Sequence, residues 1–130
     1  MAGKVIGTSL NIGWPGTQSR QADAIIQNRV ADGAIAFGKA VKLTGENKWK
    51  QIAAGDTAAD VAGIAVREVV QANVYNPQSN HDYLDKTPAD VMVRGNCIVK
   101  CQKGTPSAGG SVYVRIAADS THPEYEIGGF

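Results

Sequence analysis

Histidines and paired carboxylates are the side chains that most often do chemistry, and this chain of 130 residues offers few arrangements of them. Its two histidines, His81 and His122, stand in polar stretches that predict loops. The segment SNHDYLD contains one possible nucleophilic set, Ser79, His81 and Asp85. A catalytic triad needs fixed geometry on a rigid scaffold, and near neighbours in one loop rarely supply it. A solvated loop is the better interpretation of this segment.

The acidic residues also fail to form a recognisable site. His122 and Glu124 occur together in HPEYE, but no second ligand pair with zinc-like spacing accompanies them. Carboxylates for glycoside hydrolysis would come from loop or strand-edge positions that are typical of solvation. These candidates are Asp82, Asp85, Asp90, Glu124 and Glu126. With no glycine-rich phosphate loop either, the sequence predicts no enzyme, no metal and no cofactor.

The two cysteines, Cys97 and Cys101, lie four residues apart on one face of a predicted strand. That spacing separates their Cα atoms by about 13 Å at roughly 3.3 Å per residue. A disulfide needs Cα atoms within about 7 Å, so the two cannot bridge each other. The chain has no Cys or His cluster that could share a metal with them. We expect two reduced, buried thiols that behave as small apolar side chains.

The elements that would position these side chains are predicted by alternating apolar and polar residues. PADVMVRGNCIVKC, residues 88–101, has the two-residue period of a strand. Similar patterns predict strands at 34–43, 62–70 and 111–117. A turn at 44–48 precedes a short return strand, and Thr57 begins a single helical turn.

These strands predict which side chains are buried. The residues expected in the core are Val91, Val93, Cys97, Val99, Val112, Val114, Ile64 and Val66. Arg94, Lys100 and Arg115 should point outward. The strand at 62–70 is apolar on both faces, so it should be central in the sheet or covered at a subunit contact.

The first 33 residues differ from the rest of the chain. They are rich in Gly, Asn, Gln and Ser, and GWPGTQSRQ is typical of a turn. Only residues 24–30 have a strand-like pattern. We therefore predict an extended N-terminal arm at 1–33 and a β-rich core domain at 34–130. The fold class is mainly all-β, a small barrel (including a β-tulip-like form) or a sandwich, with at most one short helical turn.

Composition and charge exclude several functions. The chain has no apolar run near the roughly 20 residues that cross a bilayer, and no apolar leader, so we expect synthesis in a cytoplasm and no membrane contact. Residues 1–50 carry seven basic and three acidic groups (+4), and residues 51–130 carry six and nine (−3). Neither half is basic or aromatic enough to indicate nucleic acid. The asymmetry suits a protein that meets another protein at one end, and chance explains it equally well.

Five segments in order resemble the capsid cement, or decoration, proteins of tailed bacteriophages. They are GWPGTQSRQADAIIQNRVA, AIAFGKAVKL, TAADVAGIAVREVVQ, PADVMVRGNCIVKC and GTPSAGGSVYVR, which together span roughly residues 12–116. The resemblance implies a small β-rich fold that binds the outside of an icosahedral capsid in the virion and clamps neighbouring major capsid proteins together. It also implies a homo-oligomer, most often a trimer, with no enzymatic activity and no cofactor.

The residues of the arm suggest which side chains make those contacts. Trp and Arg dominate the energetics of many interfaces, and the arm holds both in a stretch without sheet-like alternation. The candidate capsid- or subunit-contact residues are Trp14, Pro15, Arg20, Ile25 and Arg29. Alternatively, Trp14 folds back and plugs the open end of the barrel.

Two other functions stay open. A β-barrel ligand-binding module, for carbohydrate or receptor binding in a phage tail or fibre, would line a groove with exposed aromatic rings. A small hydrolase would depend on His81.

Overall fold

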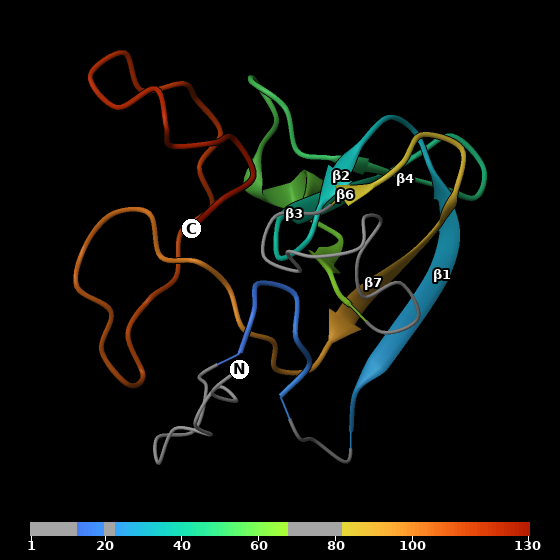
Figure 1. Ribbon diagram of the computed structural model, residues 1–130, viewed down its shortest axis with the longest axis horizontal. Helices are drawn as coiled ribbons and strands as arrows, with labels where there is room; N and C mark the ends of the chain where they lie inside the picture. The colour runs from blue at the N-terminus through green and yellow to red at the C-terminus, as the bar shows by residue number, and fades with distance from the viewer. Residues whose placement is uncertain (1–12, 20–22, 68–81) are drawn as a thin grey trace, which may run out of the picture.

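The computed structural model describes residues 13–19, 23–67 and 82–130, and in these parts it is nearly all β (Figure 1). In chain order the elements are β1 (Ile25–Ala31), β2 (Ile35–Ala36), β3 (Ala40–Thr44), β4 (Lys48–Gln51), the 3-10 turn η1 (Ala58–Asp60), β5 (Gly63–Ala65), β6 (Asp82–Tyr83) and β7 (Pro88–Arg94). This confirms the predicted fold class, including the single helical turn. No helix among the described residues is long and apolar enough to cross a membrane.

Five strands close into a barrel in the order β1-β4-β3-β5-β7, which selects the barrel over the sandwich. The longest ladder joins β1 and β7, which pair antiparallel from Ile25↔Arg94 to Val30↔Pro88. The barrel closes through β1 and β4, which are parallel and share a shorter register at Val30 and Ala31. β2 and β6 form a separate two-stranded sheet.

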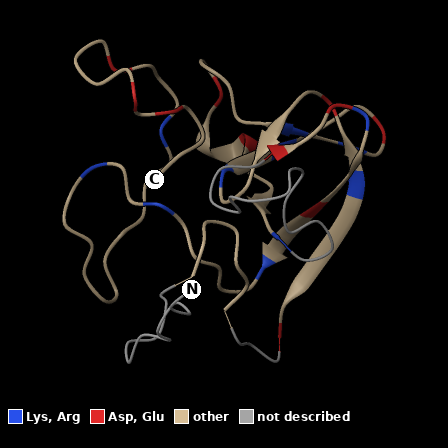
Figure 2. Cartoon of the chain, in the orientation of Figure 1, with Lys and Arg blue, Asp and Glu red and all other residues tan. Residues whose placement is uncertain are grey.

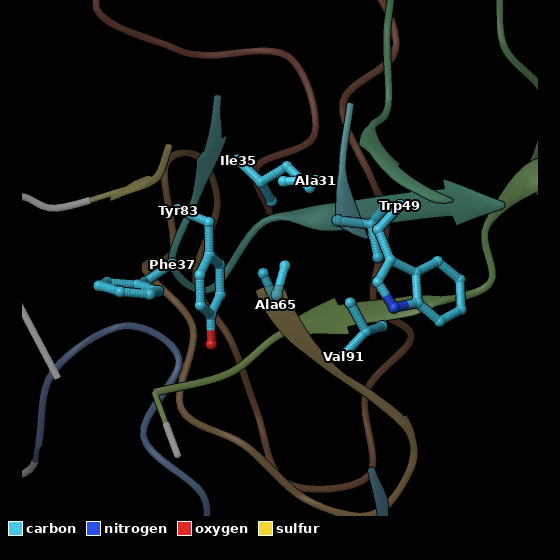
Figure 3. Close-up of a cluster of buried hydrophobic side chains, with 9 residues drawn as sticks. Ala31, Ile35, Phe37, Trp49, Ala65, Tyr83 and Val91 are labelled. Carbon is cyan, nitrogen blue, oxygen red and sulfur yellow. The ribbon is translucent and has the colours of Figure 1, made fainter. Parts of the chain in front are cut away.

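The core of the barrel is a compact cluster of aliphatic and aromatic side chains (Figure 3). Phe37 and Tyr83 meet edge to face with ring centroids 4.9 Å apart, while Trp49 lies over the opposite part of the cluster near Val91. The cluster is formed by Ala31, Ile35, Phe37, Val41, Trp49, Ala65, Tyr83, Ala89 and Val91. Val91 and Val66 are fully buried as predicted.

β1 lies inside the segment that the sequence assigned to an extended arm. Its residues were the one strand-like stretch there, and their ladder with β7 makes them part of the barrel wall. The barrel therefore begins at Ile25, before the predicted core domain at 34–130. Few side chains of this 7-residue strand are buried, so its sequence shows little alternation of apolar and polar residues. Pairing with neighbouring strands, more than its own pattern, holds it in place.

The predicted strand at 34–43 is two strands. β2 ends at Ala36, a turn follows at Phe37 and Gly38, and β3 begins at Ala40. Gly38 has φ +75°, a left-handed conformation that ends a strand. Val41 is fully buried, but Leu43, two residues later on the same face of the strand, is 51% exposed near the end of β3.

The structure differs most from the prediction at the two C-terminal strands. β7 ends at Arg94, where Gly95 adopts φ +140°, and beyond it Cys97 makes an isolated bridge to Gln18. Residues 111–117 form no strand, and Val112, which was predicted to be buried, is 72% exposed.

Other predictions for this part of the chain hold only in part. Val93, Cys97, Val99, Val114 and Ile64 are half-buried. Arg94 and Lys100 face solvent as predicted, whereas Arg115 is half-buried.

We call residues 95–130 the C-terminal lobe; apart from the Cys97 bridge it consists of loops that extend to one side of the barrel (Figure 1). Its last residues fasten it to the barrel. Ala40 N–H donates to Gly128 O at 2.8 Å, and Arg115 and the tail bond reciprocally, Arg115 N–H to Gly129 O and Gly128 N–H to Arg115 O, both at 2.8 Å. Lys39 adds an ion pair to Glu126 at 2.7 Å.

Candidate functional site

The N-terminal loop, residues 13–19, is docked on its own chain by its backbone. Gly16 N–H donates to Ile98 O at 2.8 Å, and Ile98 N–H donates to Thr17 O at 2.9 Å. On the other side of the loop, Arg67 N–H donates to Gly16 O at 2.8 Å. These contacts hold the described part of the predicted arm between the barrel and the C-terminal lobe.

Two glycines permit this docking because they bring two backbone segments into contact. Gly16 and Gly38 have φ +81° and +75°. A Cβ on Gly38 would lie 2.9 Å from both Gly16 N and Pro15 Cβ, which is closer than side-chain carbons approach such atoms. Pro15 is fixed as well, since its carbonyl accepts a hydrogen bond from Arg67 Nε at 2.7 Å. The sequence pattern placed Gly16 in a turn, but it did not predict the close approach of Gly16 and Gly38.

Trp14 is presented at the surface by this rigid turn. Its side chain is 42% exposed, and the tryptophan of the barrel core is Trp49, which is 2% exposed. Trp14 is not part of the buried cluster and therefore does not plug the barrel. Its backbone N–H donates to Thr17 Oγ1 at 3.2 Å, and Thr17 N–H donates back to Trp14 O at 2.9 Å.

The other predicted contact residues lie in different places. Ile25, 44% exposed, begins β1 and pairs with Arg94 at the end of β7. Arg29 is on β1, with its guanidinium 5.1 Å from the Trp49 ring centroid and Nη1 3.3 Å from Asn47 Oδ1. Arg20 lies outside the described residues.

The structure brings two of these contact regions together at one end of the barrel. Ser19 N–H donates to Asn96 O at 2.9 Å, just beyond the end of β7 where Ile25 pairs. The N-terminal loop and the start of β1 therefore flank the same strand end (Figure 1). Arg29 lies further along β1, beside the turn between β3 and β4.

A groove of about 1150 Å³ opens beside Trp14. Its walls come from the N-terminal loop, from residues 34–39 around β2, and from residues 98–102 and 124–129 of the C-terminal lobe. Charges of both signs line it: Lys39, Arg67, Lys100, Asp82, Glu124 and Glu126. Among the described residues, Lys and Arg are likewise interspersed with Asp and Glu (Figure 2).

Arg67 is a structural residue that the sequence pattern did not reveal. It is 6% exposed, and its guanidinium lies 4.5 Å from the centroid of the Phe37 ring. Burial lowers the pKa of this guanidinium below its ordinary value, but arginine stays protonated at any physiological pH. An arginine among apolar residues in GIAVREV is the signal that could have found it. It joins the N-terminal loop to the barrel core.

The side chains that could take part in a reaction do not form a site among the described residues. Ser79 and His81 lie outside the described residues, and Asp85 Oδ1 accepts a hydrogen bond from Gly33 N–H at 2.8 Å. His122 Nδ1 is 3.0 Å from Glu124 Oε1, and its ring stacks on Tyr125 at 4.7 Å, in an exposed loop. In the part of the chain that is described, no three His, Cys, Asp or Glu residues gather as a metal site would require.

The two cysteines differ from each other. Both are free, which agrees with the prediction that they do not bridge. Cys97 is half-buried, and burial raises the pKa of its thiol. The prediction that Cys101 is buried is wrong, because Gly95 ends the strand that would have carried it inward. Cys101 Sγ instead lies 3.4 Å from Lys103 O at the surface.

Together these features define a small closed β-barrel with a docked N-terminal loop and an appended lobe of loops. A comparison with protein families matches residues 3–130 to the phage family described as "Structural cement protein (E217 gp24/Pam3 gp6)". The chain belongs to this family of phage structural cement proteins, as its sequence resemblance implied. Among curated proteins and among solved structures, none matches the chain.

Proposed function

We propose that this protein binds the outer surface of an icosahedral phage capsid and cements neighbouring major capsid proteins, and that it catalyses no reaction. The observation that carries the proposal is the family match over residues 3–130. A ligand that binds an assembled shell and not its separated subunits stabilises assembly by mass action. Several copies joined in a homo-oligomer, for which a trimer is our working proposal, would add avidity to individually weak contacts.

The N-terminal loop is the best-supported contact surface in this proposal. Trp14 offers a large half-exposed ring on a backbone that is already ordered, so binding would cost little additional conformational entropy. Ile25 adds exposed apolar surface at the same end of the barrel. Pro15 acts mainly by fixing the turn. Arg20 and Arg29 supply positive charge that would attract an acidic surface of a neighbouring protein, and this attraction chiefly orients docking.

A decoration assay tests the proposal. Phage particles that lack this protein are mixed with wild-type protein, Trp14→Ala or Leu84→Ala, and bound copies are counted by cryo-electron microscopy. Leu84, 55% exposed on a different loop, is the matched control. Trp14→Ala should bind about tenfold or more weakly, as expected for an interface anchor, while Leu84→Ala binds like wild type. Wild-type protein that leaves the shell bare would overturn the proposed function.

The groove beside Trp14 favours one second candidate, the ligand-binding module. Sugars stack on exposed aromatic rings, and Trp14 lines this groove together with the buried Phe37. A glycan array tests this function. Carbohydrate binding by the wild-type protein that is lost in Trp14→Ala would support it, provided that the wild-type protein also leaves capsids bare in the decoration assay.

A further inference from the structure

Exposed apolar surface collects on two parts of the chain for which the described residues supply no partner. Val112 and Tyr113, in the C-terminal lobe, are 72% and 79% exposed, and Ile116 is 40% exposed. On β1, Ile25 and Val30 are 44% and 37% exposed. In Figure 1 the loop that carries the first group and strand β1 lie on opposite sides of the molecule, so the two groups cannot meet within one chain.

The first part has the sequence of a strand without a ladder. SVYVRIA alternates as β7 does, and valine, tyrosine and isoleucine all favour strands. Within the described residues, the backbone–backbone hydrogen bond of residues 104–114 is Gly110 N–H to Ser107 O, a local turn. The next residue, Arg115, is fixed to the tail of the chain through Gly128 and Gly129. The segment is therefore anchored at one end while its backbone groups face solvent.

The second part is a strand edge that has no neighbouring strand in the part of the chain that the structure describes. Residues 25–29 of β1 pair with β7 on one side, while β4 pairs with β1 at Val30 and Ala31. Val30 N–H points to the β4 side, where it donates to Asn47 O at 3.3 Å. Because backbone groups alternate along a strand, Asn28 and Ile26 present theirs to this same side. No backbone hydrogen bond to them from that side occurs within the described residues.

The chemistry of the two parts matches. Residues 104–114, GTPSAGGSVYV, contain no charged side chain, and neither do Ile25, Ile26, Gln27 and Asn28. Exposed strand edges are usually protected from pairing by charges, prolines or a covering loop, and residues 25–28 of β1 carry neither charge nor proline. An extended segment that adds to such an edge gains main-chain hydrogen bonds and pockets for alternate side chains.

We infer that residues 111–114 of one copy add as a strand to the open edge of β1, residues 25–28, in a second copy of this chain. The contact is head to tail, because it joins two different surfaces. Repeated around a rotation axis it closes a ring in which every open edge is filled. This deepens the proposed function, on which it rests for the biological setting. It assigns the copy-to-copy contact to the C-terminal lobe and β1, so that Ile25 becomes a subunit-contact residue, and it leaves Trp14 and the N-terminal loop for the capsid.

A photo-crosslinking experiment tests the inference with full-length protein on decorated particles. Tyr113 is replaced by the photoreactive amino acid p-benzoylphenylalanine, which keeps an aromatic ring at an exposed site. This variant is mixed with ¹⁵N-labelled wild-type protein, bound to particles and irradiated, and crosslinked peptides are mapped by mass spectrometry. The same replacement at Ala54, exposed on the turn after β4, is the control.

The inference predicts crosslinks from position 113 to residues 24–30 of the ¹⁵N copy. Adding Val112→Asp should lower their yield about tenfold by burying a charge, while Ser107→Asp in the same loop leaves it unchanged. Crosslinks to the major capsid protein, to other residues of this chain, or to nothing would each overturn the inference. Decoration is counted separately, so particles that stay decorated without the expected crosslink reject this contact and not the proposed function.

Discussion

β7 and residues 111–117 have nearly the same alternating sequence pattern and opposite fates. PADVMVR is a barrel strand that pairs with β1 on one side and β5 on the other, and Val91 is fully buried in it. SVYVRIA forms no strand in the single chain, and Val112 is 72% exposed. Alternation shows that a segment can form a half-buried strand. Whether it does depends on a neighbouring edge and a core for its apolar face.

The same contrast separates the barrel from the C-terminal lobe. The barrel is held by continuous ladders around a shared core, so its contacts support one another. The lobe is attached to the barrel by hydrogen bonds from Ala40 N–H to Gly128 O and from Gln51 Nε2 to Ile127 O, and by an ion pair between Lys39 and Glu126. We therefore expect substitutions in the barrel to act on global unfolding and those in the lobe to act locally.

The largest expected effect compares the two tryptophans. Trp49→Ala should lower the free energy of unfolding by about 3–5 kcal/mol, because it empties a site in the barrel core. Trp14→Ala should cost less than about 1 kcal/mol, since that ring is already half in water. Urea denaturation measures both. Equal losses of unfolding free energy in the two variants would show that Trp14 is part of the core, as Trp49 is.

A second comparison uses two glycines of the lobe with similar backbone angles. Gly128 (φ +83°) and Gly109 (φ +74°) have the left-handed conformation, so changing either to alanine should lower the free energy of local unfolding of the lobe by about 1–2 kcal/mol. At Gly128 the new Cβ would also lie 3.3 Å from Gln51 Cγ and 3.4 Å from Ala40 O, while Gly109 has open space.

Hydrogen exchange separates these two effects. Gly128→Ala should speed exchange at the Ala40 and Arg115 amides, which donate to the tail, whereas Gly109→Ala leaves both unchanged. Unchanged exchange in Gly128→Ala would mean that the tail does not fasten the lobe to the barrel.

Acid should affect the two regions differently. In the barrel, the Ala53 N–H and the Lys42 ammonium hold the pKa of Asp56 below its ordinary 3.8. A lowered folded-state pKa means that the stabilisation is complete above 3.8 and is lost as the pH falls through the lowered pKa. Asp56→Asn should therefore flatten the fall in the urea midpoint as the pH drops below 3.8.

In the lobe, hydrogen bonds from the N–H groups of Thr121 and His122 lower the pKa of Asp119, as the Ala53 N–H lowers that of Asp56. Asp119→Asn should leave the global acid profile unchanged and speed exchange of these two amides. An altered global profile would show that the lobe unfolds together with the barrel.

The smallest expected effect concerns the cysteines. Maleimide should modify exposed Cys101 about tenfold or more faster than Cys97 at neutral pH, because burial both covers the Cys97 thiol and raises its pKa. Cys101→Ser should change stability by less than about 0.5 kcal/mol. Mass spectrometry after timed labelling gives the rates, and equal rates would place Cys97 outside the packed region.

The sequence predicted much of the local structure correctly. It predicted the strand that became β7, the turn between β3 and β4, and the helical turn at 58–60, where the Thr57 N–H and hydroxyl both donate to Asp60 Oδ2. These features depend on alternation, turn residues and capping, which act over a few residues. The contact candidates Trp14, Pro15, Ile25 and Arg29 remain predictions. The structure adds that the N-terminal loop and Ile25 flank the same end of β7, while Arg29 lies further along β1.

The residues that sequence reasoning missed all depend on contacts between distant segments. Gly38 is required because Pro15 and Gly16 approach it, and Arg67 is buried because it holds the N-terminal loop. β1 looked like part of an arm because its pairing with β7, more than sixty residues later, sets its structure. No local pattern encodes such pairings, since their energies arise only when both segments are in place.

By itself the sequence determined the all-β class, the family, and the absence of a recognisable catalytic pattern, because composition, alternation and motif order are written along the chain. Tertiary structure alone decided that the strands close into a barrel through the β1–β4 contact, and that β7 stops at Gly95. It also decided that an equally strand-like segment, residues 111–117, forms no strand in the lobe. A strand needs a second edge for its hydrogen bonds, and only the folded arrangement fixes which edges are available.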